Sequence, residues 1–193
     1  MTNPALALNR YSRILAFTLT ELAIVLGIIG TILAVIWVAA AAVYENNHTA
    51  RASEQVMQII TGFKSIYGAS RVNIADWTDI TSLAINNQFL PADMIVPGNT
   101  SNGVGPWSGS TVNVYSYQSG DGIIILYNSL NQTACNHFGN AVATTNPGLI
   151  WADINGTQAG NASSVSPGWT TANINTYCSL ASGNYVYVMY SMN

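Results

Sequence analysis

A long apolar stretch, residues 17–43, constrains what this chain can fold into. It reads FTLTELAIVLGIIGTILAVIWVAAAAV, and behind Glu21 the 22 residues 22–43 carry no charge. As a helix those 22 residues would measure roughly 33 Å at about 1.5 Å per residue, close to the ~30 Å thickness of a bilayer's hydrocarbon core. The sequence therefore predicts a helix that can span a membrane.

The residues in front of this stretch have the order of a processed leader. Arg10 and Arg13 come first, and the small residue Ala16 stands directly before Phe17. A secretory signal is cut behind its apolar run, whereas a cut at Ala16 would leave the helix on the mature protein. We expect residues 1–16 to be removed, with the basic residues on the cytoplasmic side and the bulk of the chain across the membrane.

Leader, cut site and helix together resemble the type IV pilins and their class III (prepilin) signal. The resemblance rests on three features, which are the small residue before Phe17, the position of Glu21 as fifth residue of the mature chain, and the apolar helix. Gly27 and Gly30 resemble the type IVb branch, particularly PilS-like thin-pilus pilins. The family usually has Gly before the cut, where this chain has Ala16.

The resemblance implies roles for these residues. A prepilin peptidase would cut between Ala16 and Phe17 and methylate the new amine of Phe17, and Glu21 would pair with that amine on a neighbouring subunit. The alternative for Glu21 is an interfacial residue of a signal anchor. Gly27 and Gly30 allow two interpretations, a loosened helix or close helix packing through small residues.

The resemblance also implies partners and location. The chain would be a type IVb prepilin in the bacterial inner membrane with its head domain in the periplasm, and then a subunit of an extracellular homopolymeric pilus (fimbrium). Expected partners are the prepilin peptidase, the pilus assembly platform with its ATPase complex, minor pilins, and a host or recipient-cell receptor. Family functions are adhesion, aggregation and conjugative mating contact. A minor pilin, a type II secretion pseudopilin and a membrane-anchored extracytoplasmic binding or enzymatic domain are the alternatives.

The rest of the chain predicts an α+β fold, a type IV pilin fold by resemblance. The helix continues through an amphipathic half, residues 44–68, whose apolar residues recur at helical spacing, and an αβ head domain follows at 69–193. In the head we expect an antiparallel sheet, a helix near 79–87 capped by Thr78, an irregular connection to Trp107, and a helix from Asn131 to Val142. The expected strands lie around Val112 and Val114 and at residues 122–128, 149–154 and 184–192.

Cys135 and Cys178 are the only cysteines. An even pair in an exported domain indicates a disulfide, which would bound a C-terminal loop region, 135–178. Within it, the stretch from Asn155 to Thr176 is rich in Gly, Ser, Thr and Asn. The alternative is a pair of buried free thiols. Two tryptophans of this region, Trp151 and Trp169, are interpreted as packing residues or as exposed contacts.

Composition argues against several functions. Charged residues make up 7 % of the chain, and residues 72–193 contain no Lys or Arg, so nucleic-acid binding by the head is not expected. His48 and His137 lack a nucleophile partner, so we expect no enzyme, and we expect no cofactor or metal. The stretch from Asp153 to Thr157 is part of a calcium-loop pattern or an ordinary Asn-Gly turn, and the missing later ligands favour the turn.

Overall fold

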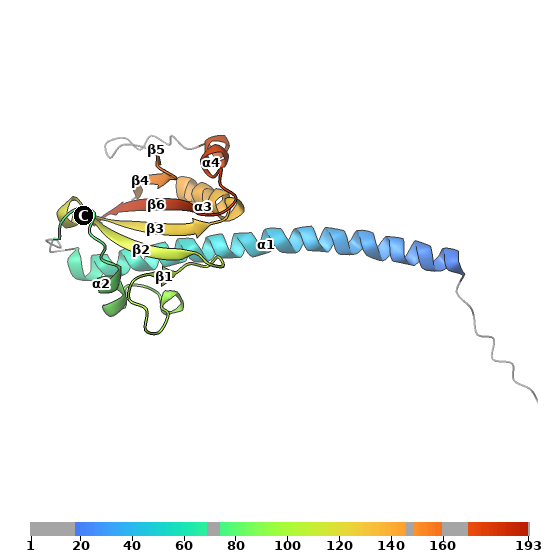
Figure 1. Cartoon of the computed structure of the whole chain (residues 1–193), viewed down its shortest axis with the longest axis horizontal. Coiled ribbons are helices and arrows are strands. Elements are labelled where there is room, and N and C mark those ends of the chain that lie inside the picture. Colours follow the sequence, from blue (N-terminus) through green and yellow to red (C-terminus); the bar gives the residue numbers. More distant parts are fainter. Residues whose placement is uncertain (1–17, 69–73, 146–148, 160–169, 193) are drawn as a thin grey trace, which may run out of the picture. The chain divides into compact units, whose positions relative to one another are not determined.

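The computed structural model describes residues 18–68, 74–145, 149–159 and 170–192 (Figure 1). Its first element is α1, Leu19–Tyr67, an unbroken helix of 49 residues. The single long helix expected from the sequence is therefore confirmed. The chain divides into two units between Ala41 and Ala42, so α1 contributes its first part to one unit and its second part to the other.

The second unit is built on a six-stranded sheet in which every neighbouring pair is antiparallel, in the order β1-β2-β3-β6-β4-β5. The last strand of the chain thus lies at the centre, beside β3, and the predicted antiparallel sheet is confirmed. The strands are β1 Gly103–Val104, β2 Thr111–Tyr117, β3 Gly122–Leu130, β4 Leu149–Ile154, β5 Thr157–Ala159 and β6 Asn184–Ser191.

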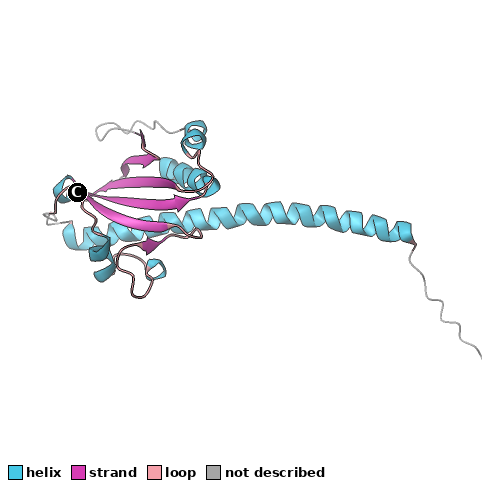
Figure 2. Ribbon diagram, in the orientation of Figure 1, coloured by secondary structure: helices cyan, strands magenta, loops and turns pink. Residues whose placement is uncertain are grey.

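One face of the sheet holds the main core. The second part of α1 and the helix α3, Gln132–Thr145, cover this face (Figure 2). The strands present apolar residues there at every second position, as a half-buried sheet requires. The buried residues of α1 follow helical spacing, and they are Ala52, Val56, Ile59, Ile60 and Phe63, with Gln55 as the one polar member.

The other face carries a smaller cluster. Ile124, Trp151 and Met189 are buried there, and partly buried Tyr115, Tyr117, Ile150 and Tyr187 pack around them. Among the residues that the structure describes, this cluster contains none from a helix. This cluster is therefore formed by side chains of the sheet itself.

The predicted cap of the helix near 79–87 was wrong. The helix is α2, Thr81–Asn86. Its N-cap residue is Ile80, whose side chain forms no capping hydrogen bond. The backbone N–H of Thr78 instead donates to Ser116 Oγ at 3.2 Å, and the Thr78 carbonyl accepts from the Ser116 N–H at 3.0 Å. Thr78 pairs with β2 because the segment before α2 runs alongside that strand, which a local capping rule does not consider.

Two regions expected to be irregular contain regular elements. The connection before Trp107 includes a 3-10 turn, Ala92–Met94, and the strand β1. The Gly-, Ser- and Thr-rich loop behind β4 contains β5 and the helix α4, Thr171–Tyr177, whose N-cap Thr170 accepts a hydrogen bond from the Asn173 N–H at 3.3 Å. These elements are short and are stabilised by tertiary contacts, so local composition did not indicate them.

Candidate assembly helix and the disulfide-bounded region

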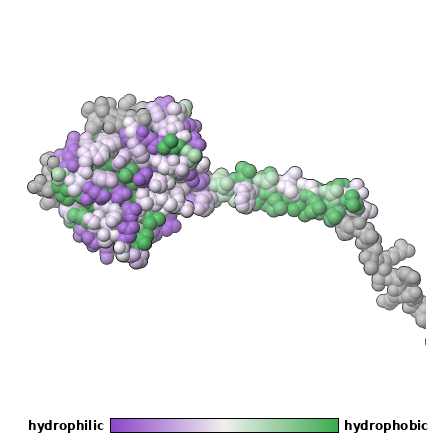
Figure 3. All heavy atoms as spheres, in the orientation of Figure 1, coloured by the Kyte–Doolittle hydropathy of each residue, from purple (hydrophilic) through white to green (hydrophobic). Residues whose placement is uncertain are grey.

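The first part of α1 exposes its large apolar side chains. Leu26, Ile36 and Trp37 are 60 %, 56 % and 79 % exposed. The most apolar 18 residues contain no buried residue, and the helix is long and apolar enough to cross a membrane (Figure 3). A continuous apolar surface of this size marks a contact with lipid or with other protein chains.

The helix begins with a reciprocal pair of hydrogen bonds between Thr18 and Glu21. Thr18 Oγ1 accepts from the Glu21 N–H at 3.3 Å, while Glu21 Oε2 accepts from the Thr18 N–H at 2.9 Å and from its hydroxyl at 2.8 Å. This arrangement is a capping box, which satisfies N–H groups that the first helical turn leaves unpaired. The capping role of Thr18 was not predicted from the sequence, although a Thr three residues before a Glu at a helix start is the signal for it.

Gly27 and Gly30 face open space in the described part of the chain. A Cβ added to Gly27 or to Gly30 would meet nothing within 4 Å, so the fold of the single chain does not require glycine at either position. Ala16 and Phe17, the expected cleavage and methylation sites, lie outside the described residues.

A polar network joins the second part of α1 to the head domain. Asp93 Oδ2 accepts from Arg51 Nη2 at 2.8 Å and from Gln55 Nε2 at 2.9 Å. The hydroxyl of Tyr127 on β3 lies 3.3 Å from Gln55 Oε1. Partial burial raises the pKa of Asp93, but the hydrogen bonds from Arg51 and Gln55 outweigh this effect and hold the pKa below its ordinary value.

Trp107 forms a second connection to α1. Its Nε1–H donates to Glu45 Oε2 at 3.0 Å, and its ring packs against Phe138 of α3 with centroids 5.7 Å apart. The ring of His48 lies between two aromatic neighbours, 4.1 Å from Tyr44 and 6.3 Å from Trp107 between centroids. His48 is therefore a packing residue between Tyr44 and Trp107.

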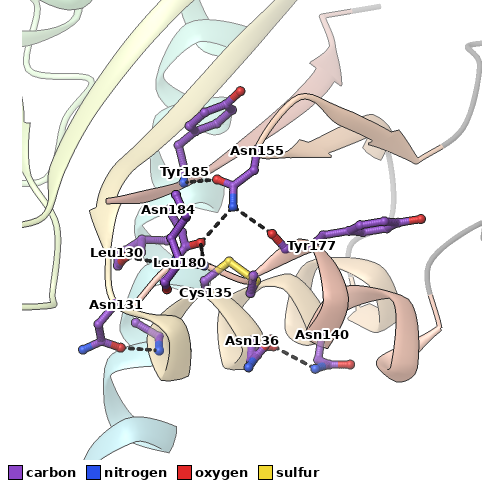
Figure 4. The surroundings of a disulfide bond; sticks show 12 residues. Leu130, Asn131, Cys135, Asn136, Asn140, Asn155, Tyr177, Leu180, Asn184 and Tyr185 are labelled. Carbon is purple, nitrogen blue, oxygen red and sulfur yellow. Dashed lines mark hydrogen bonds between the residues drawn. A yellow bond between two sulfur atoms is a disulfide. The ribbon is translucent and has the colours of Figure 1, made fainter. Parts of the chain in front are cut away.

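The disulfide expected from the sequence is present between Cys135 on α3 and Cys178 at the end of α4 (Figure 4). The two Cα atoms are 5.7 Å apart and both side chains are fully buried. The predicted N-terminal cap of α3 is also confirmed, because Asn131 Oδ1 accepts from the Ala134 N–H at 2.8 Å. The bond fixes α4 against α3.

Asn155 forms hydrogen bonds with several segments around the disulfide (Figure 4). Its Nδ2 donates to the Tyr177 carbonyl oxygen and to Asn184 Oδ1, both at 2.8 Å, and its Oδ1 accepts from the Tyr185 N–H at 2.9 Å. Asn184 in turn donates to the carbonyl oxygens of Leu130 and Leu180. Amide side chains thus hold the β4–β5 hairpin, α4 and β6 together.

The stretch from Asp153 to Thr157 is an Asn-Gly hairpin turn, as favoured from the sequence. Asn155 and Gly156 have φ angles of 52° and 83°, as a two-residue type I′ turn needs, and Ile154 pairs with Thr157. Asp153 Oδ1 accepts from the Gly156 N–H at 2.7 Å. Within the described part of the chain, no group of three His, Cys, Asp or Glu side chains is placed to hold a metal ion.

His137 and Trp169 complete the list of residues singled out from the sequence. His137 borders a polar hollow between α3 and α4 together with Thr133, Asn136, Asn140 and Asn175. Trp151 is 8 % exposed and belongs to the cluster on the face of the sheet opposite α1. Its interpretation as a packing residue is therefore confirmed. Trp169 lies outside the described residues.

Comparison with known proteins shows which fold the chain resembles. No family model matches the chain, and a search of curated proteins finds no match. Among solved structures, the crystal structure of TcpA, a type IV pilin from Vibrio cholerae El Tor biotype, is similar with a TM-score of 0.54 and 12 % sequence identity. The match covers 75 % of this chain and 99 % of that chain. The long helix, the antiparallel sheet and the Cys135–Cys178 bond match the type IV pilin fold.

Proposed function

We propose that this chain is the structural subunit of a type IVb pilus, made as a prepilin and assembled into a surface filament. The observation that carries the proposal is a helix start capped by Glu21 and followed by large apolar side chains that stay exposed among the described residues. The similarity of the fold to a type IV pilin supports it.

In this proposal, a prepilin peptidase cuts after Ala16 in the inner membrane and methylates Phe17, while the head domain lies in the periplasm. An assembly platform and its ATPase complex then move the subunit out of the bilayer. Lipid tails are as apolar as the helix, so leaving them requires another apolar environment. Packing the first parts of α1 against one another provides it, and burial of one Leu or Ile side chain from water is worth about 1.5–3 kcal/mol.

In this proposal, Glu21 sets how far each subunit's helix is shifted along its neighbour. A carboxylate among apolar helices is costly unless a charge compensates it, and the methylated amine of Phe17 on a neighbouring subunit is the partner that the proposal assigns. Gly27 and Gly30 let neighbouring helices approach closely, because neither has a side chain and the space where a Cβ would stand is open among the described residues. The filament then serves adhesion, aggregation or mating contact.

Immunogold electron microscopy of material sheared from cells tests this function. We expect filaments decorated along their whole length by antibody against the head domain. Decoration only at tips or sparse sites would indicate a minor pilin. Protein confined to the membrane fraction, with no filaments in cells that make the assembly proteins, would favour the anchored-domain or pseudopilin alternative and contradict the proposal.

A further inference from the structure

The face of the sheet opposite α1 is lined with aromatic side chains. Along β2 and β6 the residues alternate between core and this outer face, which receives Tyr115, Tyr117, Tyr185 and Tyr187. Cross-strand pairing sets them in rows, because Tyr115 pairs with Ile124, Ile124 with Met189, and Met189 with Trp151. We call this surface the aromatic face.

Trp77 lies over the aromatic face. Its ring centroid is 6.5 Å from that of Tyr117, 6.3 Å from that of Trp151 and 6.2 Å from that of Tyr187. These three rings stand on β2, β4 and β6, so Trp77 covers the middle of the sheet. Its own side chain remains 51 % exposed.

The backbone holds Trp77 in this place. Its φ angle is 57°, in the left-handed region that a bulky residue rarely adopts. The N–H of Trp77 donates to the Ser116 carbonyl oxygen at 2.9 Å and to Asp76 Oδ1 at 3.0 Å. Asp76 Oδ1 also accepts from the Gln118 N–H at 2.9 Å, which fixes the carboxylate beside the end of β2.

Carboxylates lie at the rim of the aromatic face. Asp76 and Asp79 are exposed, and Asp79 pairs through its backbone with Tyr115. Asp79 Oδ1 accepts from the Thr81 N–H at 2.8 Å, and its Oδ2 accepts a long hydrogen bond of 3.4 Å from Asn113 Nδ2. Burial raises the pKa of the Tyr115 hydroxyl, and the nearby charge of Asp79 raises it further. No Lys or Arg occurs in residues 74–192, so among the described residues neither the strands nor the Trp77 segment contains a cation.

We propose that the aromatic face binds an arginine-bearing segment of another protein, with Trp77 and the carboxylates of Asp76 and Asp79 as its contacts. A guanidinium group can stack on the exposed ring of Trp77 and can also donate hydrogen bonds to a carboxylate, and Asp76 is the residue before Trp77. A quaternary ammonium group has no donor for the carboxylates, and a lysine ammonium group cannot stack as a plane. The surrounding charge is complementary to arginine, which favours encounter as well as binding.

This inference does not depend on filament formation, so calorimetric titration of the full-length chain in detergent with a hexa-arginine peptide tests it. We expect saturable binding that weakens as salt is raised. Hexa-lysine should bind more weakly. Tetramethylammonium chloride should compete no better than sodium chloride at the same ionic strength.

Two substitutions and a matched control locate the binding. Asp76→Asn keeps the Oδ1 acceptor and should weaken hexa-arginine binding about two- to fivefold, the range for an exposed cation contact. Trp77→Leu should weaken it by a similar factor, with Trp77→Phe in between as the variant that keeps an aromatic cover. Glu54→Gln removes one charge from an exposed site on α1 and should leave the affinity unchanged.

Three results would overturn the inference. One is absence of hexa-arginine binding by the wild-type chain. Another is an equal loss in Glu54→Gln and Asp76→Asn, since that would mean unspecific attraction to a negatively charged protein. The third is competition by tetramethylammonium beyond the salt effect, because a choline-type ligand would then fit the face better than arginine.

Discussion

Glu21 Oε2 accepts two hydrogen bonds from Thr18, one from its backbone N–H at 2.9 Å and one from its hydroxyl at 2.8 Å. Both of these bonds end on the same carboxylate oxygen. Within the described residues, no hydrogen bond to Oε1 is found, and the residue is exposed. Under the proposed function, one carboxylate can close its own helix start and still receive the amine of a neighbouring subunit.

Replacing Glu21 by Val should abolish filaments or reduce them severely. Val keeps the helix apolar, so the amount of protein in the membrane fraction should not change, while the amine of the neighbouring subunit loses its partner. Electron microscopy of sheared material and immunoblots of membranes measure the two effects separately. Glu54→Gln, with the same change of charge on the exposed second part of α1, should assemble normally.

Thr18 variants separate the cap from the charge. Thr18→Ser keeps the hydroxyl and should assemble as wild type, whereas Thr18→Val loses a cap worth about 1 kcal/mol and should reduce filament yield less than Glu21→Val does. Normal piliation of Glu21→Val would remove the charge-pairing argument, whatever the Thr18 variants do.

The disulfide should stabilise the head domain substantially. Cys135 and Cys178 are separated by 43 residues, for which the chain-entropy model gives roughly 4 kcal/mol. We expect Cys178→Ser to lower the thermal midpoint and to expose the chain around α4 to protease. Wild-type protein treated with reductant should behave in the same way. Unchanged protease resistance of Cys178→Ser under oxidising conditions would contradict this role.

Gly122 stands where the backbone of a central strand pair leaves no room for a side chain. A Cβ added there would lie 2.9 Å from the Tyr190 carbonyl oxygen, which the β3–β6 ladder holds in place. We expect Gly122→Ala to destabilise the head by about 1–3 kcal/mol, measured by chemical denaturation of the full-length chain. Gly27→Ala, whose Cβ meets nothing within 4 Å, is the control and should leave the unfolding of the head unchanged.

Asp93 should make the head domain sensitive to acid. Its pKa in the folded chain is below the ordinary value of about 3.9, so its contribution to stability is present above that value and is lost as pH falls through the folded pKa. The side chain is 36 % exposed, so solvent screening keeps the contribution small, at most about 1 kcal/mol. Asp93→Asn should lower the thermal midpoint slightly at pH 7 and flatten its decline as the pH falls below about 4, relative to wild type, by about that amount. A decline as steep as in the wild-type chain would assign the acid sensitivity to other groups.

The spacing of apolar residues and the pair of cysteines predicted the long helix, the C-terminal strand and the disulfide. The apolar run and the spaced residues from Ala52 to Phe63 predicted α1, and the alternating strand at the C-terminus predicted β6. The pair of cysteines predicted the disulfide because an even pair in a domain expected to be exported is typically oxidised.

Elements that depend on tertiary contacts could not be predicted in this way. α4 and β5 lie in a polar stretch, and their position depends on amide hydrogen bonds such as those of Asn155, which join segments far apart in sequence. The place of Trp77 depends on a left-handed backbone angle and on pairing with β2, and neither has a local signal. Thr18 is different, because its capping pattern was readable in the sequence.

Mass spectrometry of the N-terminus of the chain in sheared surface material tests the central claim most directly. The proposal predicts a peptide that begins at N-methylated Phe17, which would establish processing, export and surface assembly in one experiment. An intact leader on protein found only in the membrane fraction would contradict the proposal and favour an anchored domain.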